Sequence, residues 1–226
     1  MKLTSTQTTI LVAASAVFVG LPLVLYWIGD APYRSVLKEA ISVATLLSFA
    51  AMIGQFFMAR SNTWLLSIFR PPQIQKVHKY IAYSAVAVIL AHPLLIVLPR
   101  AFEGGVRPWD AFVTMITSFD NTGILAGLVA WVLLLVLAIT AWFRKPVIKR
   151  LSTHYRGWRY VHGGLAVGFT LLALWHSIDL GRHTDIAMSV LFLGLALIGF
   201  GILARLYWRA RPKPPLPTSE KSGAAT

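Results

Sequence analysis

Residues 78–92 read HKYIAYSAVAVILAH, and residues 162–176 read HGGLAVGFTLLALWH. Each stretch is an apolar segment with a histidine at both ends, and in each the two histidines are 14 positions apart. An α-helix turns by about 100° per residue, so 14 steps end only about 40° short of four full turns. The two histidines of each stretch therefore lie on one helix face, separated by about 21 Å along the helix axis.

The composition of the chain places these helices in a membrane. Of the 226 residues, 57% are hydrophobic and only 13% are charged, and the mean hydropathy is +0.67. A soluble domain has about a quarter charged residues. The basic residues behind the net charge of +13 lie in loops beside apolar segments, so they indicate membrane lipid rather than nucleic acid as the partner. We therefore expect an integral membrane protein that binds no nucleic acid.

Six segments are long enough to cross the hydrocarbon core of a bilayer, which takes about 20 helical residues. The expected fold is an all-α, six-helix transmembrane bundle formed by residues 1–211, followed by a disordered cytoplasmic tail at 212–226. The first apolar run is similar to a signal peptide, but it is longer than a typical signal core, so we expect a retained helix. The predicted spans are Thr9–Ile28, Leu37–Met58, Val77–Leu98, Thr122–Phe143, Trp158–Ile178 and Asp185–Tyr207.

Lysines and arginines are unevenly divided between the two sides of the predicted bundle. If the N-terminus, the loops after the second and fourth helices and the C-terminal tail share one side, that side has 16 of the 21 basic residues. The positive-inside rule makes this side cytoplasmic. We therefore expect a multi-pass protein of the cell (inner) membrane with both termini in the cytoplasm. The basic residues of the other side are Arg34, Lys38, Arg100, Arg107 and Arg182.

The histidines of the third and fifth predicted helices lie at two levels of the bilayer. Both helices start at the cytoplasmic side and run parallel, so His78 is level with His162, and His92 is level with His176. Polar groups inside a bilayer are costly, so their presence calls for a functional explanation. Two facing neutral imidazoles are a natural axial pair for haem iron. The spacing therefore predicts two haems stacked between the third and fifth helices.

Two other interpretations of these histidines compete with haem. In the first interpretation, the histidines are ordinary interfacial or helix-contact residues. In the second, they are zinc ligands. A zinc site needs three or four ligands at one centre, which two levels about 21 Å apart do not offer. The chain has no cysteine, which excludes disulfides, iron–sulfur clusters, thiolate-ligated haem and covalent haem attachment. Any haem is therefore held non-covalently.

Other residues are candidates for a supporting part in this site. Phe169 lies seven positions from each histidine of its helix and is expected to fill the gap between the two haems, or to be an ordinary packing residue. Pro93 cannot donate a backbone hydrogen bond and is expected to bend the third helix, while His183 follows the fifth helix where an external acceptor or a propionate would lie. Haem propionates need cationic partners. The candidates are Arg70 and Arg159 inside and Arg182 outside, with Lys76, Arg156, Arg100 and Arg107 as further possibilities.

The chain resembles the ferric-reductase-like transmembrane domain, the six-helix module of ferric reductases, NADPH oxidases and the haem subunit of the bacterial periplasmic methionine sulfoxide reductase system. The resemblance covers roughly Leu37–Tyr207. It implies that His78, His92, His162 and His176 are the axial ligands of two b-type haems and that electrons move from the cytoplasmic to the outer face. It rests on the contexts FRPPQIQKVHKYIAY, ILAHPL, RGWRYVHGG and LALWHSI.

The expected function is transmembrane electron transfer by an oxidoreductase component, a membrane cytochrome b whose status as an enzyme in its own right stays open. Ferric reductases and NADPH oxidases usually continue into a flavin and nicotinamide-nucleotide domain, whereas no glycine-rich dinucleotide fingerprint occurs in this sequence. We therefore expect a separate flavin reductase, a loosely bound flavin or membrane quinol as the donor, and a ferric chelate, oxygen or a periplasmic redox protein as the external acceptor. The alternatives are a haem subunit that serves one periplasmic reductase, such as methionine sulfoxide reductase, and a cofactor-free transporter or structural membrane protein.

Overall fold

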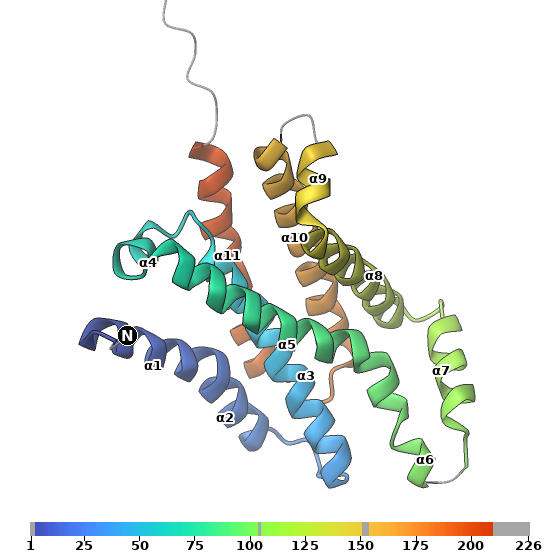
Figure 1. The fold of residues 1–226 in the computed structure, drawn as a ribbon. Helices are drawn as coiled ribbons and strands as arrows, with labels where there is room; N and C mark the ends of the chain where they lie inside the picture. The colour runs from blue at the N-terminus through green and yellow to red at the C-terminus, as the bar shows by residue number, and fades with distance from the viewer. Residues whose placement is uncertain (1–2, 104, 151–153, 210–226) are drawn as a thin grey trace, which may run out of the picture.

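Figure 1 shows the computed structural model of the chain, which describes residues 3–103, 105–150 and 154–209. All regular secondary structure in these ranges is helical, as the sequence predicted. The tail expected at residues 212–226 lies outside the described residues.

Six helices in the described ranges are long and apolar enough to cross a membrane, which confirms the predicted number. The first span is built from α1, a π-helical turn η1 and α2, and the second from α3 with a 3₁₀ turn η2. The elements are α1 (Ser5–Ser15), η1 (Ala16–Gly20), α2 (Leu21–Ile28), α3 (Val36–Gly54), η2 (Gln55–Met58), α5 (Pro71–Val97), α8 (Thr122–Trp142), α10 (His154–Leu180) and α11 (Ile186–Arg209). Four shorter helices, which the sequence did not predict, lie between them: α4 (Thr63–Ile68), α6 (Arg100–Glu103), α7 (Pro108–Thr117) and α9 (Arg144–Arg150).

The largest difference from the predicted boundaries is at the start of α5, which begins at Pro71 instead of Val77. Proline fits the first turn of a helix because its fixed φ angle suits the helix and its missing N–H would have no partner there. The backbone N–H of Arg70 donates to Gln73 Oε1 at 2.9 Å and closes this turn. The turn is polar, so hydropathy did not detect it. At the other end, α5 continues through Pro93 to Val97 without interruption.

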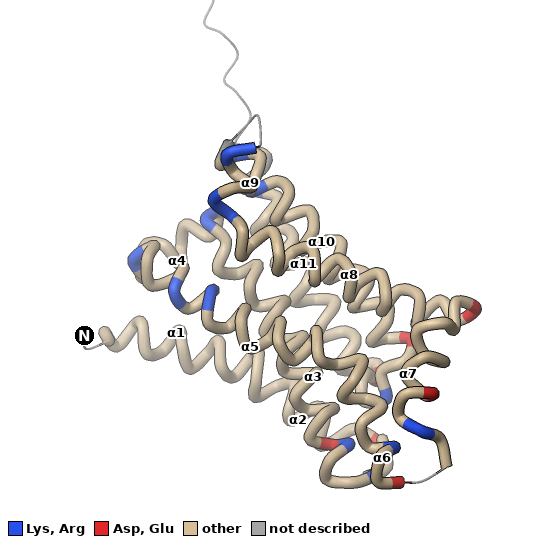
Figure 2. Tube along the Cα trace, turned by 45° about the vertical axis from the view of Figure 1, so that its right-hand side comes forward, with Lys and Arg blue, Asp and Glu red and all other residues tan. Residues whose placement is uncertain are grey.

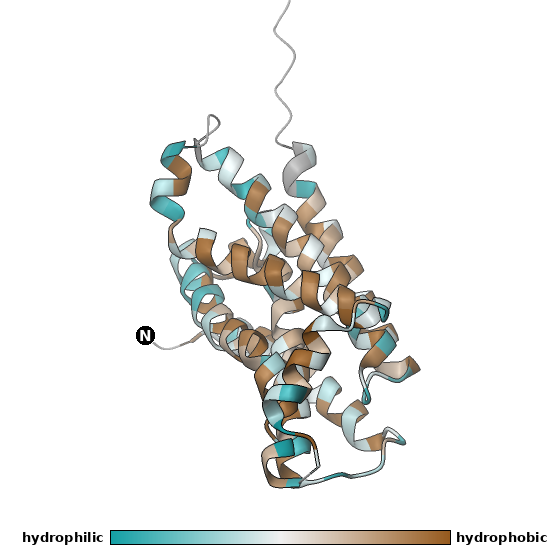
Figure 3. Ribbon diagram, turned by 90° about the vertical axis from the view of Figure 1, so that its right-hand side faces the viewer, coloured by the Kyte–Doolittle hydropathy of each residue, from teal (hydrophilic) through white to brown (hydrophobic). Residues whose placement is uncertain are grey.

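The long helices pack in two close pairs, α3 with α5 and α8 with α10, and α11 packs against α3 and α10 (Figure 1). The backbones of α5 and α10 do not pack closely along each other in the described part of the chain. The core between the pairs includes Phe49 of α3 and Phe192 of α11, whose rings meet edge to face with centroids 5.3 Å apart. Figure 3 shows hydrophobic residues along the middle of the helices. Many large apolar side chains are exposed on the outside of the bundle, as lipid contact requires.

The first span packs against the second. The rings of Phe18 and Phe57 meet edge to face at 5.3 Å, and Gln7 Nε2 donates to the backbone oxygen of Ile68 in α4 at 3.0 Å. The π-helical turn η1 precedes Pro22, a fully buried proline. Proline inside a helix removes one backbone hydrogen bond and crowds the preceding turn, and a wider π turn relieves that conflict.

Charged residues divide the bundle into two ends (Figure 2). Lysines and arginines gather around α4, α9 and the start of α5, which we call the basic end. Acidic residues gather around α6, α7 and the α2–α3 loop, which we call the acidic end. At the acidic end Lys38 of α3 forms an ion pair with Glu103 of α6 at 2.7 Å. Both α5 and α10 start at the basic end, so they run parallel.

Two glycines of α11 provide a test of the packing between α11 and η2. A Cβ atom at Gly199 would lie 2.8 Å from Cβ of Phe56, whereas one at Gly201 would meet nothing within 4 Å. We expect Gly199→Ala to lower the free energy of unfolding by about 1–3 kcal/mol through overpacking. Gly201→Ala is expected to be neutral or to add up to about 1 kcal/mol of helix propensity. Equilibrium unfolding of both variants in detergent measures the difference in their free energies of unfolding. Equal values would contradict the close packing of Gly199 against Phe56.

Candidate functional site

The structure brings the four histidines of α5 and α10 together in two pairs. The ring centroids of His78 and His162 are 6.5 Å apart, and those of His92 and His176 are 6.4 Å apart. The first pair, here the inner pair, lies toward the basic end, and the second, the outer pair, lies toward the acidic end. Each pair joins one histidine of α5 to the histidine of α10 that the sequence placed at the same level.

The separation within each pair suits one metal atom between two imidazoles. A metal–imidazole bond is about 2.0 Å long and the ring centre lies about 1.1 Å behind the nitrogen, so two such bonds in line separate the ring centroids by about 6.2 Å. Direct stacking or a direct hydrogen bond would bring the rings closer than this. The spacing at both levels therefore fits an axial pair on a planar cofactor such as haem.

The outer pair is braced by residues of α3 and α8. His176 Nδ1 lies 2.8 Å from the backbone oxygen of Gly123, and His92 Nδ1 lies 3.2 Å from Thr45 Oγ1. A carbonyl oxygen only accepts hydrogen bonds, so His176 carries its proton on Nδ1 and keeps a free lone pair on Nε2. Such contacts orient a ligating histidine and define its tautomer.

Gly127 of α8 makes room for the outer pair. A Cβ atom there would come within 2.5 Å of His176 Nδ1 and 2.8 Å of its Cε1. One turn earlier, a Cβ atom at Gly123 would likewise clash with the side chains of Asp179 and Leu180 of α10. Sequence reasoning missed both glycines, although small residues four positions apart on an apolar helix are a known signal of close helix packing. They explain how α8 approaches α10 closely enough to contact a histidine.

The surroundings of the inner pair are different. Trp158 is a buried residue one turn before His162 on α10. The centroids of the Trp158 and His162 rings are 5.1 Å apart, and the angle between the ring planes is 36°. His162 Nδ1 is buried and has no hydrogen-bond partner among the residues that the structure describes. The inner pair is therefore packed by an aromatic ring where the outer pair is held by hydrogen bonds.

Phe169 lies between the two levels on α10 and is only 1% exposed. It belongs to the same core cluster as Ala85 of α5 and Ala130 and Leu134 of α8. Phe169 is thus a fully buried ring of the shared core, at a level between the two histidine pairs.

The three candidate arginines are placed differently. Arg70 is exposed at the start of α5, and the Arg159 guanidinium, one turn before His162, lies 5.6 Å from the ring centroid of Tyr155. Arg182 is exposed after α10, and its Nη2 donates to the backbone oxygen of Pro32 at 2.9 Å. Of the three, Arg159 lies nearest along its helix to a histidine pair, and Arg182 is bound to the loop between α2 and α3.

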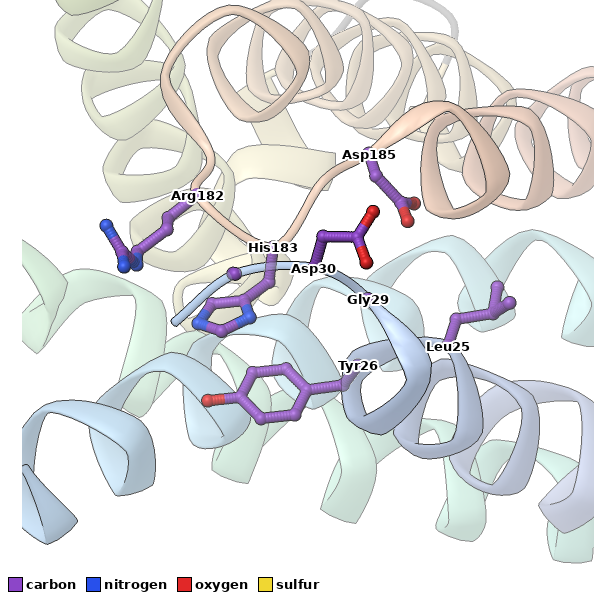
Figure 4. A pocket seen from close by; sticks show the side chains of 8 residues that line it. Leu25, Tyr26, Gly29, Asp30, Arg182, His183 and Asp185 are labelled. Atoms are coloured by element: carbon purple, nitrogen blue, oxygen red, sulfur yellow. The ribbon is translucent and has the colours of Figure 1, made fainter. Parts of the chain in front are cut away.

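His183 lies apart from the two pairs, in a cluster at the acidic end (Figure 4). Its ring stacks on Tyr26 with centroids 4.1 Å apart, and its Nε2 is 3.2 Å from Glu39 Oε2. Burial lowers the pKa of His183, although the Glu39 carboxylate opposes this. The adjoining cavity of about 180 Å³ also has Asp30 and Asp185 in its wall, and it is smaller than ordinary ligand sites of about 300 Å³ or more.

A multi-ligand metal site is not formed in the described ranges, where no group of three or more His, Cys, Asp and Glu residues converges. The two-histidine levels are instead suited to a metal whose other ligands come from a macrocycle.

The chain is similar to known proteins over much of its length. Residues 44–173 match the model of the family described as ferric reductase like transmembrane component. This range includes His78, His92 and His162 and ends three residues before His176. The chain is also 40% identical over 163 residues to an uncharacterized protein of Archaeoglobus fulgidus, an alignment that covers 72% of this chain and 86% of the relative. No solved structure matches the chain.

Gly127 allows the outer pair to be tested as a binding site. If each histidine pair holds a haem, Gly127→Ala should displace the His176 imidazole and remove about one of two haems from the purified protein, because the new methyl group occupies the space of the ring. The control is Gly164→Ala on α10, where a Cβ atom would meet nothing within 4 Å. Pyridine-haemochrome quantitation measures the result, and unchanged haem content in Gly127→Ala would contradict it.

Proposed function

Since the chain belongs to the ferric reductase-like transmembrane component family, we propose that it carries electrons across the membrane by means of two non-covalent b-type haems. His78 and His162 would hold the inner haem, and His92 and His176 would hold the outer haem. The observation that carries this proposal is the ring separation of 6.5 and 6.4 Å at two levels of parallel helices. A haem with two histidine ligands supplies one-electron chemistry and has no open coordination position.

The residues of this chain supply the positions and the surroundings for that chemistry. Gly123 and Gly127 let α8 hold His176 in place, while Thr45 contacts His92 from α3. Phe169 separates the two levels with a fully buried ring. With two histidines on each iron, the external acceptor would be reduced without binding the metal.

Arginines near the ends of the two helices are the proposed partners of the propionates. Arg159 and Arg70 serve the inner haem, and Arg182 serves the outer one. Arg159 has the strongest support, because it lies one helical turn from His162 and is partly buried. Arg182 is hydrogen-bonded to Pro32, so it would have to exchange that bond for a propionate.

We further propose that the basic end faces the cytoplasm, in accord with the positive-inside rule. The protein then lies in the cell (inner) membrane with both termini in the cytoplasm. Electrons enter at the basic end from a separate flavin reductase, a bound flavin or membrane quinol. They leave at the acidic end to a ferric chelate, oxygen or a periplasmic redox protein.

Haem content and spectra test this function. We expect two low-spin b-type haems per chain, measured by oxidised and dithionite-reduced absorption spectra with pyridine-haemochrome quantitation. His78→Ala or His162→Ala should remove one haem, and His92→Ala or His176→Ala should remove the other, because each iron loses an axial ligand. The control is His183→Ala, which changes a partly buried histidine outside both pairs and should keep two haems. A colourless protein from haem-replete cells would overturn the proposal in favour of a cofactor-free membrane protein.

Phe169 is expected to influence electron transfer between the two levels. We expect Phe169→Leu to keep both haems but to slow transfer between them several-fold, because the aromatic ring between them is lost. Phe192→Leu on α11 is the matched control, since Phe192 is also 1% exposed in the same core cluster. Rapid-mixing kinetics monitor the transfer. Equal rates in the two variants would assign Phe169 to packing alone.

A further inference from the structure

Thr45 of α3 touches the outer histidine pair from a helix that carries none of the four histidines. Its Oγ1 lies 3.2 Å from His92 Nδ1 and 2.8 Å from the backbone oxygen of Ile41, one turn earlier on α3. A threonine hydroxyl has one proton to donate and can accept from others. The carbonyl of Ile41 can only accept, so the hydroxyl proton is given to Ile41.

The direction of the bond to His92 follows from this. Because the proton of Thr45 is engaged with Ile41, Thr45 Oγ1 acts toward His92 as an acceptor, and His92 must carry its proton on Nδ1. The lone pair of His92 Nε2 is then free. His176 has the same tautomer, since its Nδ1 donates to the backbone oxygen of Gly123. Both imidazoles of the outer pair are thus fixed with Nε2 free for a metal.

The inner pair lacks this arrangement on at least one side. Within the described part of the chain, His162 Nδ1 is buried without a hydrogen-bond partner, and Trp158 packs beside the ring. A hydrogen bond from the N–H of a ligating imidazole raises its basicity and stabilises the more positively charged state of the metal. The two levels therefore differ in how strongly their histidines donate electrons.

We propose that Thr45 is a positioning residue of the outer haem, which fixes the tautomer of His92 through its hydroxyl and lowers the midpoint potential of that haem. This inference rests on the proposed function, because it assumes that His92 binds haem iron. Helix α3 would then influence electron transfer through one hydrogen bond, from His92 of the outer pair to Thr45. An ordinary structural role for Thr45, in which its hydroxyl only donates to the Ile41 carbonyl of its own helix, would affect folding without affecting the potential.

Three variants of the full-length protein test the proposal. Thr45→Val replaces the hydroxyl by a methyl group of similar size, and Thr45→Ser keeps the hydroxyl. Ser48→Ala removes a buried hydroxyl one turn further along α3 that is not hydrogen-bonded to His92. Redox titration followed by absorbance gives the two midpoint potentials. The component that disappears in His92→Ala identifies the outer haem.

In Thr45→Val we expect the outer midpoint potential to rise by up to about 59 mV, which is a tenfold change in the ratio of oxidised to reduced haem. The inner potential should be unchanged, and Thr45→Ser and Ser48→Ala should match the wild type. Loss of the outer haem in Thr45→Val, with retention in Thr45→Ser, would also support the hydroxyl contact. Wild-type potentials in Thr45→Val, or equal defects in Thr45→Val and Thr45→Ser, would overturn it. A wild-type protein without haem would instead overturn the proposed function itself.

Discussion

The separation of α5 and α10 is the constraint on which the arrangement of the site depends. Imidazole rings can face each other at 6.5 and 6.4 Å at two levels only if the helices that carry them are parallel and held apart. The structure achieves this by packing each of the two helices closely against another partner, α5 against α3 and α10 against α8. Small residues of α8 permit that close approach on one side. The distance between α5 and α10 is then determined by the packing of α3 and α8 against them, rather than by direct contact of α5 with α10.

The six spans and the two histidine levels could be predicted because both follow from one-dimensional patterns. Runs of about 20 apolar residues predict membrane helices, and an interval of 14 residues places two side chains on one face. The start of α5 was predicted too late because its first turns are polar, and the four short helices were missed because they are too short for a hydropathy signal. Helix α5 continues through Pro93 to Val97, and the bend expected at Pro93 stays a prediction.

The braces of the site could not be predicted, because they depend on which helix lies beside which. Thr45 reaches His92 and Gly127 accommodates His176 only through the crossing of α3 over α5 and of α8 over α10. The GILAG segment at 123–127 indicates close packing on its own, but it does not indicate its partner. His183 shows the same limit. The sequence places it just after α10, while the fold turns it toward Tyr26 and Glu39 at the acidic end.

The location of iron in the haem-loaded protein tests the central claim most directly. An experimental structure with anomalous scattering measured at the iron edge would locate each iron independently of the protein model. The account predicts two iron positions, one between His78 and His162 and one between His92 and His176, separated by about 21 Å along the bundle. A single iron position, or iron bound away from these histidines, would contradict it.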